Sequence, residues 1–166
     1  VCGIIAVADA VKPGTRGVIE ALRERGIAHL IMLTGDNRAT ADAIAREVGI
    51  DEVQAELLPE DKVATVEALV SKYGTVAMVG DGVNDAPAMA RASFGIAMGA
   101  VGSDAAIETA DIALMTDDLT KLPWLIGHSR RTLVIIRENI VFSLGVKAVF
   151  VVLTFAGFAT LWGAIA

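Results

Sequence analysis

Two aspartates four residues apart, Asp81 and Asp85, lie within the segment Gly-Asp-Gly-Val-Asn-Asp. Carboxylates supply the hard oxygen ligands that Mg²⁺ prefers, and glycines let the backbone turn sharply and approach a bound ligand. The spacing therefore predicts a Mg²⁺-dependent site that handles phosphate. The alternative is an Asx-rich turn that caps the helix expected near Pro87.

The position of these acids in the chain favours the phosphate site. They follow an apolar run at 75–79 that is typical of a short buried strand, and open α/β sheets bind their ligands at the carboxyl ends of strands. A second apolar run leads in the same way into Thr34-Gly35-Asp36. A hydroxyl and backbone amides there could hold phosphoryl oxygens, while Lys62 neutralises their charge and Asp81 binds Mg²⁺. Lys62 alone would be read as a solvated lysine at a helix start.

The elements that must position these residues alternate between strands and helices, which predicts right-handed βαβ units and a parallel sheet. In chain order, we expect strands at 3–8 and 30–33, helices at 15–25, 38–48 and from Pro59, a strand at 75–79, a short helix at 86–92, a strand at 95–99, a helix at 104–109 and a strand at 111–115.

Composition narrows the class of protein. The 166 residues suffice for one domain with a real core, and the net charge of −6 argues against a nucleic-acid partner, because phosphate backbones require a basic face. The single cysteine, Cys2, cannot form an internal disulfide, so we expect a small buried residue in a reducing compartment. No signal peptide is expected at the start of the chain.

Charged residues are almost absent from the chain after residue 138. Residues 139–166 contain one charged side chain, Lys147, in a stretch longer than the roughly 20 residues that cross a bilayer as a helix. We expect helix from Asp118, a transmembrane helix at 138–156, a turn near Gly157 and the start of a second span at 158–166. The cationic residues before the span place residues 1–137 in the cytoplasm by the positive-inside rule; they are Lys121, His128, Arg130, Arg131 and Arg137.

Lys147 lies about midway along this span. A lysine at that depth costs several kcal/mol unless it is paired or reaches the interface, so it marks a functional site with an acidic partner. Snorkelling to the interface is the alternative, and about ten apolar residues on its amino-terminal side disfavour it.

Taken together, the motifs resemble the phosphorylation domain of P-type ATPases, which has a haloacid-dehalogenase-like fold with a Rossmann-type parallel sheet. They are Leu-Thr-Gly-Asp at 33–36, Leu-Pro-Glu-Asp-Lys at 58–62, Met-Val-Gly-Asp-Gly-Val-Asn-Asp-Ala-Pro at 78–87 and Gly-Ile-Ala-Met-Gly at 95–99. The resemblance spans the whole chain. It implies that Thr34, Gly35 and Asp36 contact the phosphoryl group, Lys62 stabilises its charge, Asp81 ligates Mg²⁺, and Asn84 and Asp85 complete the site.

Within that family the chain looks most like the heavy-metal branch that exports zinc, cadmium or lead. The similar segments are 107–115, 118–123 and Ser-Leu-Gly-Val-Lys-Ala at 143–148. The resemblance implies a membrane protein of the plasma membrane, a soft divalent metal ion as cargo, and a Lys147 that faces the transport site and pairs with an aspartate on the final helix. Which metal is carried stays open.

Several family features have no counterpart in this sequence. The phosphorylated aspartate of the Asp-Lys-Thr-Gly-Thr motif, the nucleotide-binding domain that holds ATP, the actuator domain and the Cys-Pro-Cys helix are absent. We therefore expect a fragment, inactive alone, with a partial phosphorylation domain at 1–117 lacking its first strand, a connecting helix at 118–137 and the membrane segment. Its strands would expose sheet edges, and the missing amino-terminal part of the pump would be its partner.

Two other functions share the surviving motifs. A membrane-tethered phosphatase of the same fold would need a nucleophilic aspartate two positions before a general acid, and Asp9 is followed by Ala10 and Val11. A non-catalytic Mg²⁺- or phosphate-binding module that associates with a full-length transporter shares every motif and stays an alternative.

Overall fold

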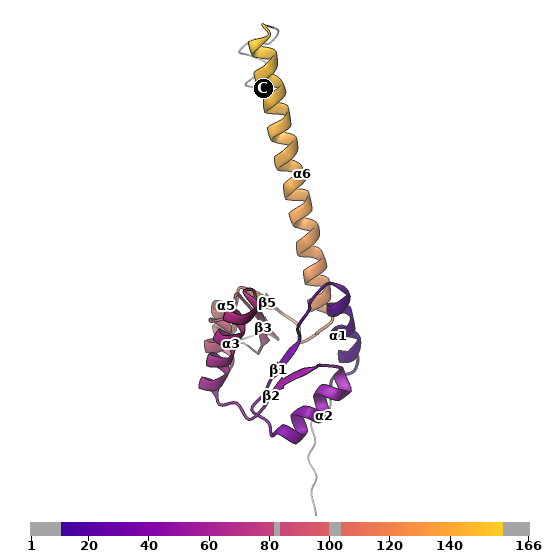
Figure 1. Ribbon diagram of the computed structural model, residues 1–166, viewed down its shortest axis with the longest axis vertical. Helices are drawn as coiled ribbons and strands as arrows, with labels where there is room; N and C mark the ends of the chain where they lie inside the picture. Colours follow the sequence, from indigo (N-terminus) through magenta and orange to yellow (C-terminus); the bar gives the residue numbers. More distant parts are fainter. Residues whose placement is uncertain (1–10, 82–83, 100–103, 158–166) are drawn as a thin grey trace, which may run out of the picture. The chain divides into compact units, whose positions relative to one another are not determined.

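The computed structural model describes residues 11–81, 84–99 and 104–157 (Figure 1). The chain divides into two compact units, Val1–Pro123 and Trp124–Ala166. The predicted strand at 3–8, Cys2, Asp9 and the predicted second span at 158–166 lie outside the described residues.

The first half of the α/β unit consists of helix α1 (Thr15–Glu24), strand β1 (Ile31–Leu33), helix α2 (Arg38–Val48) and strand β2 (Glu52–Gln54). β1 and β2 pair in parallel, with Ile31 opposite Glu52. Arg23 joins α1 to the loop after α2, because its guanidinium donates to the Gly49 carbonyl at 2.7 Å and to the Asp51 carboxylate at 2.6 Å. β2 was not predicted from the sequence, since only Val53 of its three residues is buried and so short a segment shows no alternation of apolar and polar residues.

The second half begins with the long helix α3 (Pro59–Tyr73) and continues as strand β3 (Ala77–Gly80), helix α4 (Ala86–Met89), strand β4 (Phe94–Met98), helix α5 (Asp104–Thr109) and strand β5 (Ile112–Leu114). These three strands form a parallel sheet in the order β3-β4-β5. The middle strand, β4, is buried along four of its five residues, which explains why Gly-Ile-Ala-Met is a continuous apolar run.

The core lies between α3, α4 and this second sheet. Val66, Met78, Ala88, Met89 and Ala97 form its buried centre, and Leu33 from β1 packs against it. A smaller cluster of Ala41, Ala45 and Val53 joins α2 to the first sheet. Parallel strands joined by helices that cover them are the predicted fold class, which is confirmed.

The described strands form two separate sheets, β1-β2 and β3-β4-β5, with no pairing between β1 and β3. Among the described residues, β1 pairs only with β2, and β3 pairs only with β4. Each strand therefore keeps one edge of backbone amides and carbonyls without a neighbouring strand in the described part of the chain. On β3, Val79 is 40% exposed, whereas Met78 beside it is buried in the core.

Helix α6 (Lys121–Phe155) runs without interruption for 35 residues. The ranges expected to form a connecting helix and a membrane span are thus one helix, but it begins at Lys121 and not at Asp118 as expected. Pro123 lies in its first turn, where the missing amide costs no hydrogen bond. A turn follows it at Gly157, whose φ is 78°. Among the described residues α6 is the one helix long and apolar enough to cross a membrane, and none of its most apolar window is buried.

Replacing Met89 by alanine tests the described core. The Met89 side chain is 1% exposed, so its loss leaves a cavity that costs about 2–5 kcal/mol. We expect amide hydrogen exchange of β3 and β4 to accelerate at least tenfold in the full chain. Met115→Ala is the matched control, because that side chain is 54% exposed and its loss leaves no cavity. Equal exchange rates in the two variants would contradict the placement of this core.

Just before α6, the Asp118 carboxylate accepts hydrogen bonds from the Thr120 hydroxyl at 2.7 Å and from the Thr120 amide at 3.0 Å. These bonds hold the pKa of Asp118 below its ordinary value. Because the pKa is lowered in the folded state, the two hydrogen bonds contribute fully to folding stability above the ordinary aspartate pKa of about 3.9. This contribution is lost as the pH falls through the lowered pKa. We expect a carboxyl ¹³C titration to find the low pKa, and Thr120→Ala to raise it.

Candidate functional site

The loop after β1 folds around the Thr34 hydroxyl. That hydroxyl donates to the Asp36 carboxylate at 2.8 Å and accepts from the Asp36 amide at 3.1 Å. Asn37 then caps α2, because its side-chain oxygen accepts from the Thr40 amide at 2.9 Å. A half-buried hydroxyl and an exposed carboxylate thus lie at the carboxyl end of β1.

The segment after β2 binds this loop through backbone hydrogen bonds. The Leu57 amide donates to the Thr34 carbonyl at 3.1 Å, and the Glu56 amide donates to the Asp36 carbonyl at 2.9 Å. Glu56 adopts a left-handed backbone with φ at 59°, the one positive φ outside glycine among the described residues. The Leu57 carbonyl lies 3.3 Å from where a Cβ on Gly35 would be, so Gly35 permits a close approach of the two backbones.

Lys62 and Asp85 form the central contact of the site. The Lys62 ammonium, in the first turn of α3, donates to the Asp85 carboxylate at 2.8 Å. Asp85 precedes α4, and the two side chains are only 20% and 18% exposed. A salt bridge so far removed from water is screened less than a surface pair, and its charges cost free energy to bury unless they are joined.

Gly80 makes room for this ion pair. A Cβ on Gly80 would lie 2.7 Å from an Asp85 carboxylate oxygen and 2.8 Å from the Asp85 Cβ. The Asp85 side chain therefore packs directly on the backbone at the end of β3. The first glycine of the Gly-Asp-Gly motif is required for steric reasons, with no need of an unusual φ.

Asp81 is exposed at the carboxyl end of β3 and faces Asn84. Its carboxylate accepts from the Asn84 backbone amide at 3.1 Å and from the Asn84 side-chain amide at 3.2 Å. The alternative of a turn that caps α4 is not observed, because Asp85 at the N-cap of α4 makes no side-chain capping hydrogen bond. The Asp81 carboxylate lies at the surface, where a ligand can reach it. Gly82 and Val83, between the two acids, lie outside the described residues.

The donor set suits Mg²⁺ only in part. Mg²⁺ is commonly held by one or two carboxylates together with waters and phosphate oxygens, and Asp81 offers one such carboxylate. The second predicted ligand, Asp85, is engaged by Lys62. The described residues include no group of three or more acidic, histidine or cysteine side chains that would hold a metal ion by themselves.

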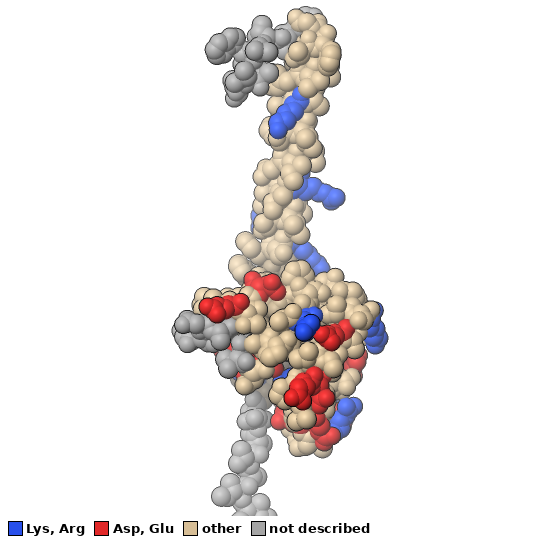
Figure 2. Space-filling view, turned by 90° about the vertical axis from the view of Figure 1, so that its left-hand side faces the viewer, with Lys and Arg blue, Asp and Glu red and all other residues tan. Residues whose placement is uncertain are grey.

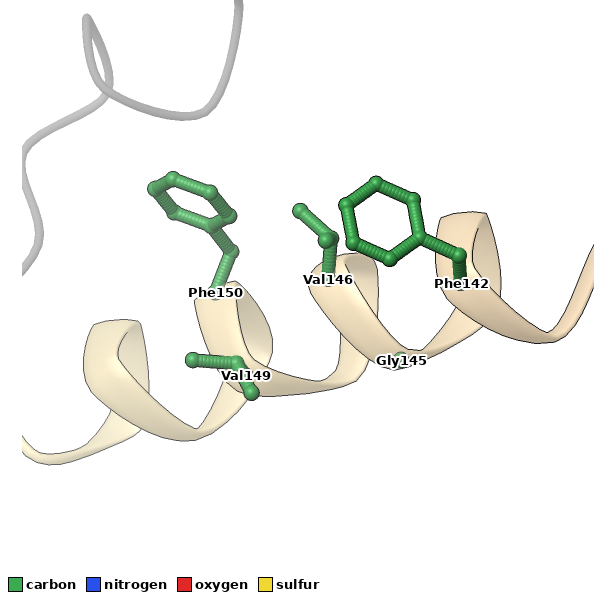
Figure 3. Close-up of a pocket in the computed structure, with 5 residues that line it drawn as sticks. All are labelled: Phe142, Gly145, Val146, Val149 and Phe150. Carbon is green, nitrogen blue, oxygen red and sulfur yellow. The ribbon is translucent and has the colours of Figure 1, made fainter. Parts of the chain in front are cut away.

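Lys147 is exposed on α6 in apolar surroundings. The stretch around it lines an open apolar pocket formed by Phe142, Gly145, Val146, Val149 and Phe150. The side chains of Phe142, Val146 and Phe150 project on the same side of the helix (Figure 3). The described part of the chain offers Lys147 no acidic partner: the nearest acid in the α6 sequence is Glu138, nine residues earlier.

Comparison with known proteins now identifies the family. A model of the haloacid dehalogenase-like hydrolases matches residues 1–93, more than half of the chain. The chain belongs to the haloacid dehalogenase-like hydrolase family. It is an enzyme by family.

The curated relatives are named as metal-transporting ATPases. Over 165 residues the chain is 53% identical to a cadmium-transporting ATPase of Staphylococcus aureus, covering 99% of this chain and 23% of the relative. A cadmium, zinc and cobalt-transporting ATPase of Bacillus subtilis is 48% identical over 166 residues, which are 98% of this chain and 24% of the relative. The predicted resemblance to the heavy-metal branch of P-type ATPases is thus confirmed.

A solved structure of a metal-transporting ATPase is also similar to this chain. A zinc-transporting PIB-type ATPase in its E2.Pi state superimposes with a TM-score of 0.85 at 46% identity, over 95% of this chain and 25% of that protein. The chain spans about a quarter of the length of the relatives it matches.

The structure joins the predicted site residues in pairs: Thr34 with Asp36, Lys62 with Asp85, and Asp81 with Asn84. Sequence reasoning missed the supporting residues Glu56, Leu57 and Gly80. A left-handed glutamate leaves no signal in a sequence. The packing of Asp85 on Gly80 could have been suspected, because a glycine that ends a strand often marks a close approach.

Adding one methyl group tests the packing beneath the ion pair. In Gly80→Ala the new Cβ collides with Asp85, so we expect a destabilisation of about 1–3 kcal/mol and displacement of the carboxylate from Lys62. Gly17→Ala is the matched control, since nothing lies within 4 Å of its Cβ and the change favours α1 by up to about 1 kcal/mol. Urea unfolding measures the change in stability of each variant, and hydrogen exchange of the β3 amides measures the local disturbance beside Asp85. A neutral Gly80→Ala would show that Asp85 does not pack there.

Proposed function

We propose that this chain is the carboxy-terminal part of an ATP-driven exporter of soft divalent metal ions, Zn²⁺, Cd²⁺ or Pb²⁺, which works through an aspartyl-phosphate intermediate. The observation that carries the proposal is the Lys62–Asp85 ion pair, half-buried next to the end of β3 that bears Asp81. A lysine held by a carboxylate at that place is suited to meet a phosphoryl group. The names of the relatives support metal export.

Each residue of the site has a distinct task in this proposal. The Thr34 hydroxyl and the amides of Gly35 and Asp36 hold the oxygens of the phosphoryl group, while Lys62 balances its charge. Asp85 keeps the Lys62 ammonium in place, and Asn84 orients the Asp81 carboxylate through two hydrogen bonds. Asp81 would hold Mg²⁺, which supplies Lewis-acid stabilisation of phosphoryl oxygens when bound.

The divided sheet supports a second part of the proposal. β1 and β3 each have one edge without a neighbouring strand in the described part of the chain, yet Leu33 of β1 packs on the core that contains Met78 of β3. We infer that a strand carried by another part of the pump lies between them and brings the phosphorylated aspartate to the site. ATP would then bind to a nucleotide domain outside these residues, so that the chain alone is inactive.

The membrane segment completes the proposal. α6 crosses the plasma membrane from about residue 138, residues 1–137 lie in the cytoplasm, and Lys147 faces the transport site. The apolar composition and exposure of α6 support this placement.

A chimera tests the function directly. Residues 1–166 replace the matching quarter of the Staphylococcus aureus cadmium-transporting ATPase, and phosphoenzyme formation from radiolabelled ATP and cadmium tolerance of cells are measured. We expect an active chimera. Lys62→Ala and Asp81→Asn should each reduce turnover by roughly 10²-fold or more, because each removes a charge at the phosphoryl group.

Lys72→Ala is the control for this chimera, since Lys72 lies at the far end of α3 over the Tyr73 ring. In the active chimera, the amides of β3 should also become protected from hydrogen exchange, because a strand now covers that edge. A folded chimera that forms no phosphoenzyme would contradict the proposal. It would favour the non-catalytic phosphate-binding module instead.

A further inference from the structure

The first half of α6 concentrates positive charge. Arg130, Arg131 and Arg137 are exposed, and Figure 2 shows basic side chains spaced along an otherwise uncharged helix surface. The α6 sequence contains one acid, Glu138. None of the ion pairs in the described part of the chain includes these three arginines, whereas Arg16, Arg23 and Arg91 of the α/β unit each pair with an acid.

Helix geometry sets these arginines at a defined depth. A bilayer has a hydrocarbon core of about 30 Å, and roughly 5–7 Å of headgroup region lies on each side. If the core begins just after Arg137, the rise of 1.5 Å per residue puts Arg130 and Arg131 about 10 Å below it. Long arginine side chains can span the remaining distance, so all three guanidinium groups reach headgroup level.

The chemistry of the side chains selects the partner. A guanidinium presents a planar fork of donors that matches phosphate oxygens, and it keeps its charge at any physiological pH. Arg130 and Arg137 are seven residues apart, two turns along the same face, and Arg131 lies about 100° round the helix. Guanidinium groups on two sides of α6 can therefore each bind a phosphate.

We propose that Arg130, Arg131 and Arg137 form a binding collar for the phosphate headgroups of anionic phospholipids in the cytoplasmic leaflet. This inference rests on the membrane span proposed above. The occupant is lipid and not free phosphate, because the collar directly adjoins some 18 residues without an acid, and lipid alone would satisfy the arginines and the apolar surface together.

Lipid selection can be measured by fluorescence quenching. The full chain with Trp124→Phe, Trp162→Phe and Ile140→Trp carries one indole about one turn above Arg137. It is reconstituted in vesicles of phosphatidylcholine and phosphatidylglycerol, with one or the other lipid brominated. Quenching gives the relative binding constant of the two lipids next to the helix.

We expect phosphatidylglycerol to be preferred at least tenfold at low salt, because each basic residue near an anionic surface contributes about a fivefold gain. The preference should fall towards one in Arg130→Gln/Arg131→Gln/Arg137→Gln and weaken in 0.5 M salt. It should persist in the matched triple variant Arg16→Gln/Arg46→Gln/Arg91→Gln, which removes the same charge from exposed positions of the α/β unit.

Two outcomes would overturn the collar. One is an equal affinity for both lipids in a chain that resists alkaline extraction from the vesicles, and the other is an equal loss in both triple variants. A chain that alkaline extraction removes would refute the span and the collar together. Phosphoenzyme formation by the chimera is read separately, so failure of the collar leaves the proposed pump function standing.

Discussion

The half-buried ion pair between Lys62 and Asp85 is the contact on which the site depends. It joins the first turn of α3 to the start of α4, and it fits only because Gly80 leaves room for the Asp85 side chain at the end of β3. Three elements are thereby fixed around one charge pair. Breaking such a pair leaves an uncompensated charge away from water, which costs more than the intact pair contributes to stability. The pair therefore specifies geometry more than it adds free energy.

The two sheets follow from the same packing. α3 and α4 cover β3 and β4, while β1 reaches their core only through Leu33. Backbone groups at the open edges of β1 and β3 need hydrogen-bond partners, which under the proposal above a strand from elsewhere in the pump would supply. A site whose loops follow separate sheets is held less firmly than one on a continuous sheet. Completion of the sheet and assembly of the phosphoryl site are in this view a single event.

Sequence reasoning succeeded where pattern and chemistry coincide. The helices at 38–48 and 104–109 and the strand between Ser93 and Gly99 follow from periodicity, capping and glycine stops. It failed at β2, where three residues with one buried side chain carry no period. The pairing of Lys62 with Asp85 was beyond it too, because the sequence offers Asp81 and Asp85 as equivalent acids. Only the packing on Gly80 separates their roles.

The long helix poses a different physical problem, because its basic stretch and its apolar stretch are continuous in one helix. Leu122 is buried, whereas the window from which the membrane span is inferred contains no buried residue. Arg137 and Lys147 are ten residues apart, about 15 Å along the axis, so arginines at headgroup level would place Lys147 near mid-membrane. Lipid contacts that fix the depth of the collar would thereby also fix the depth of Lys147, and with it the partner that this charge can reach.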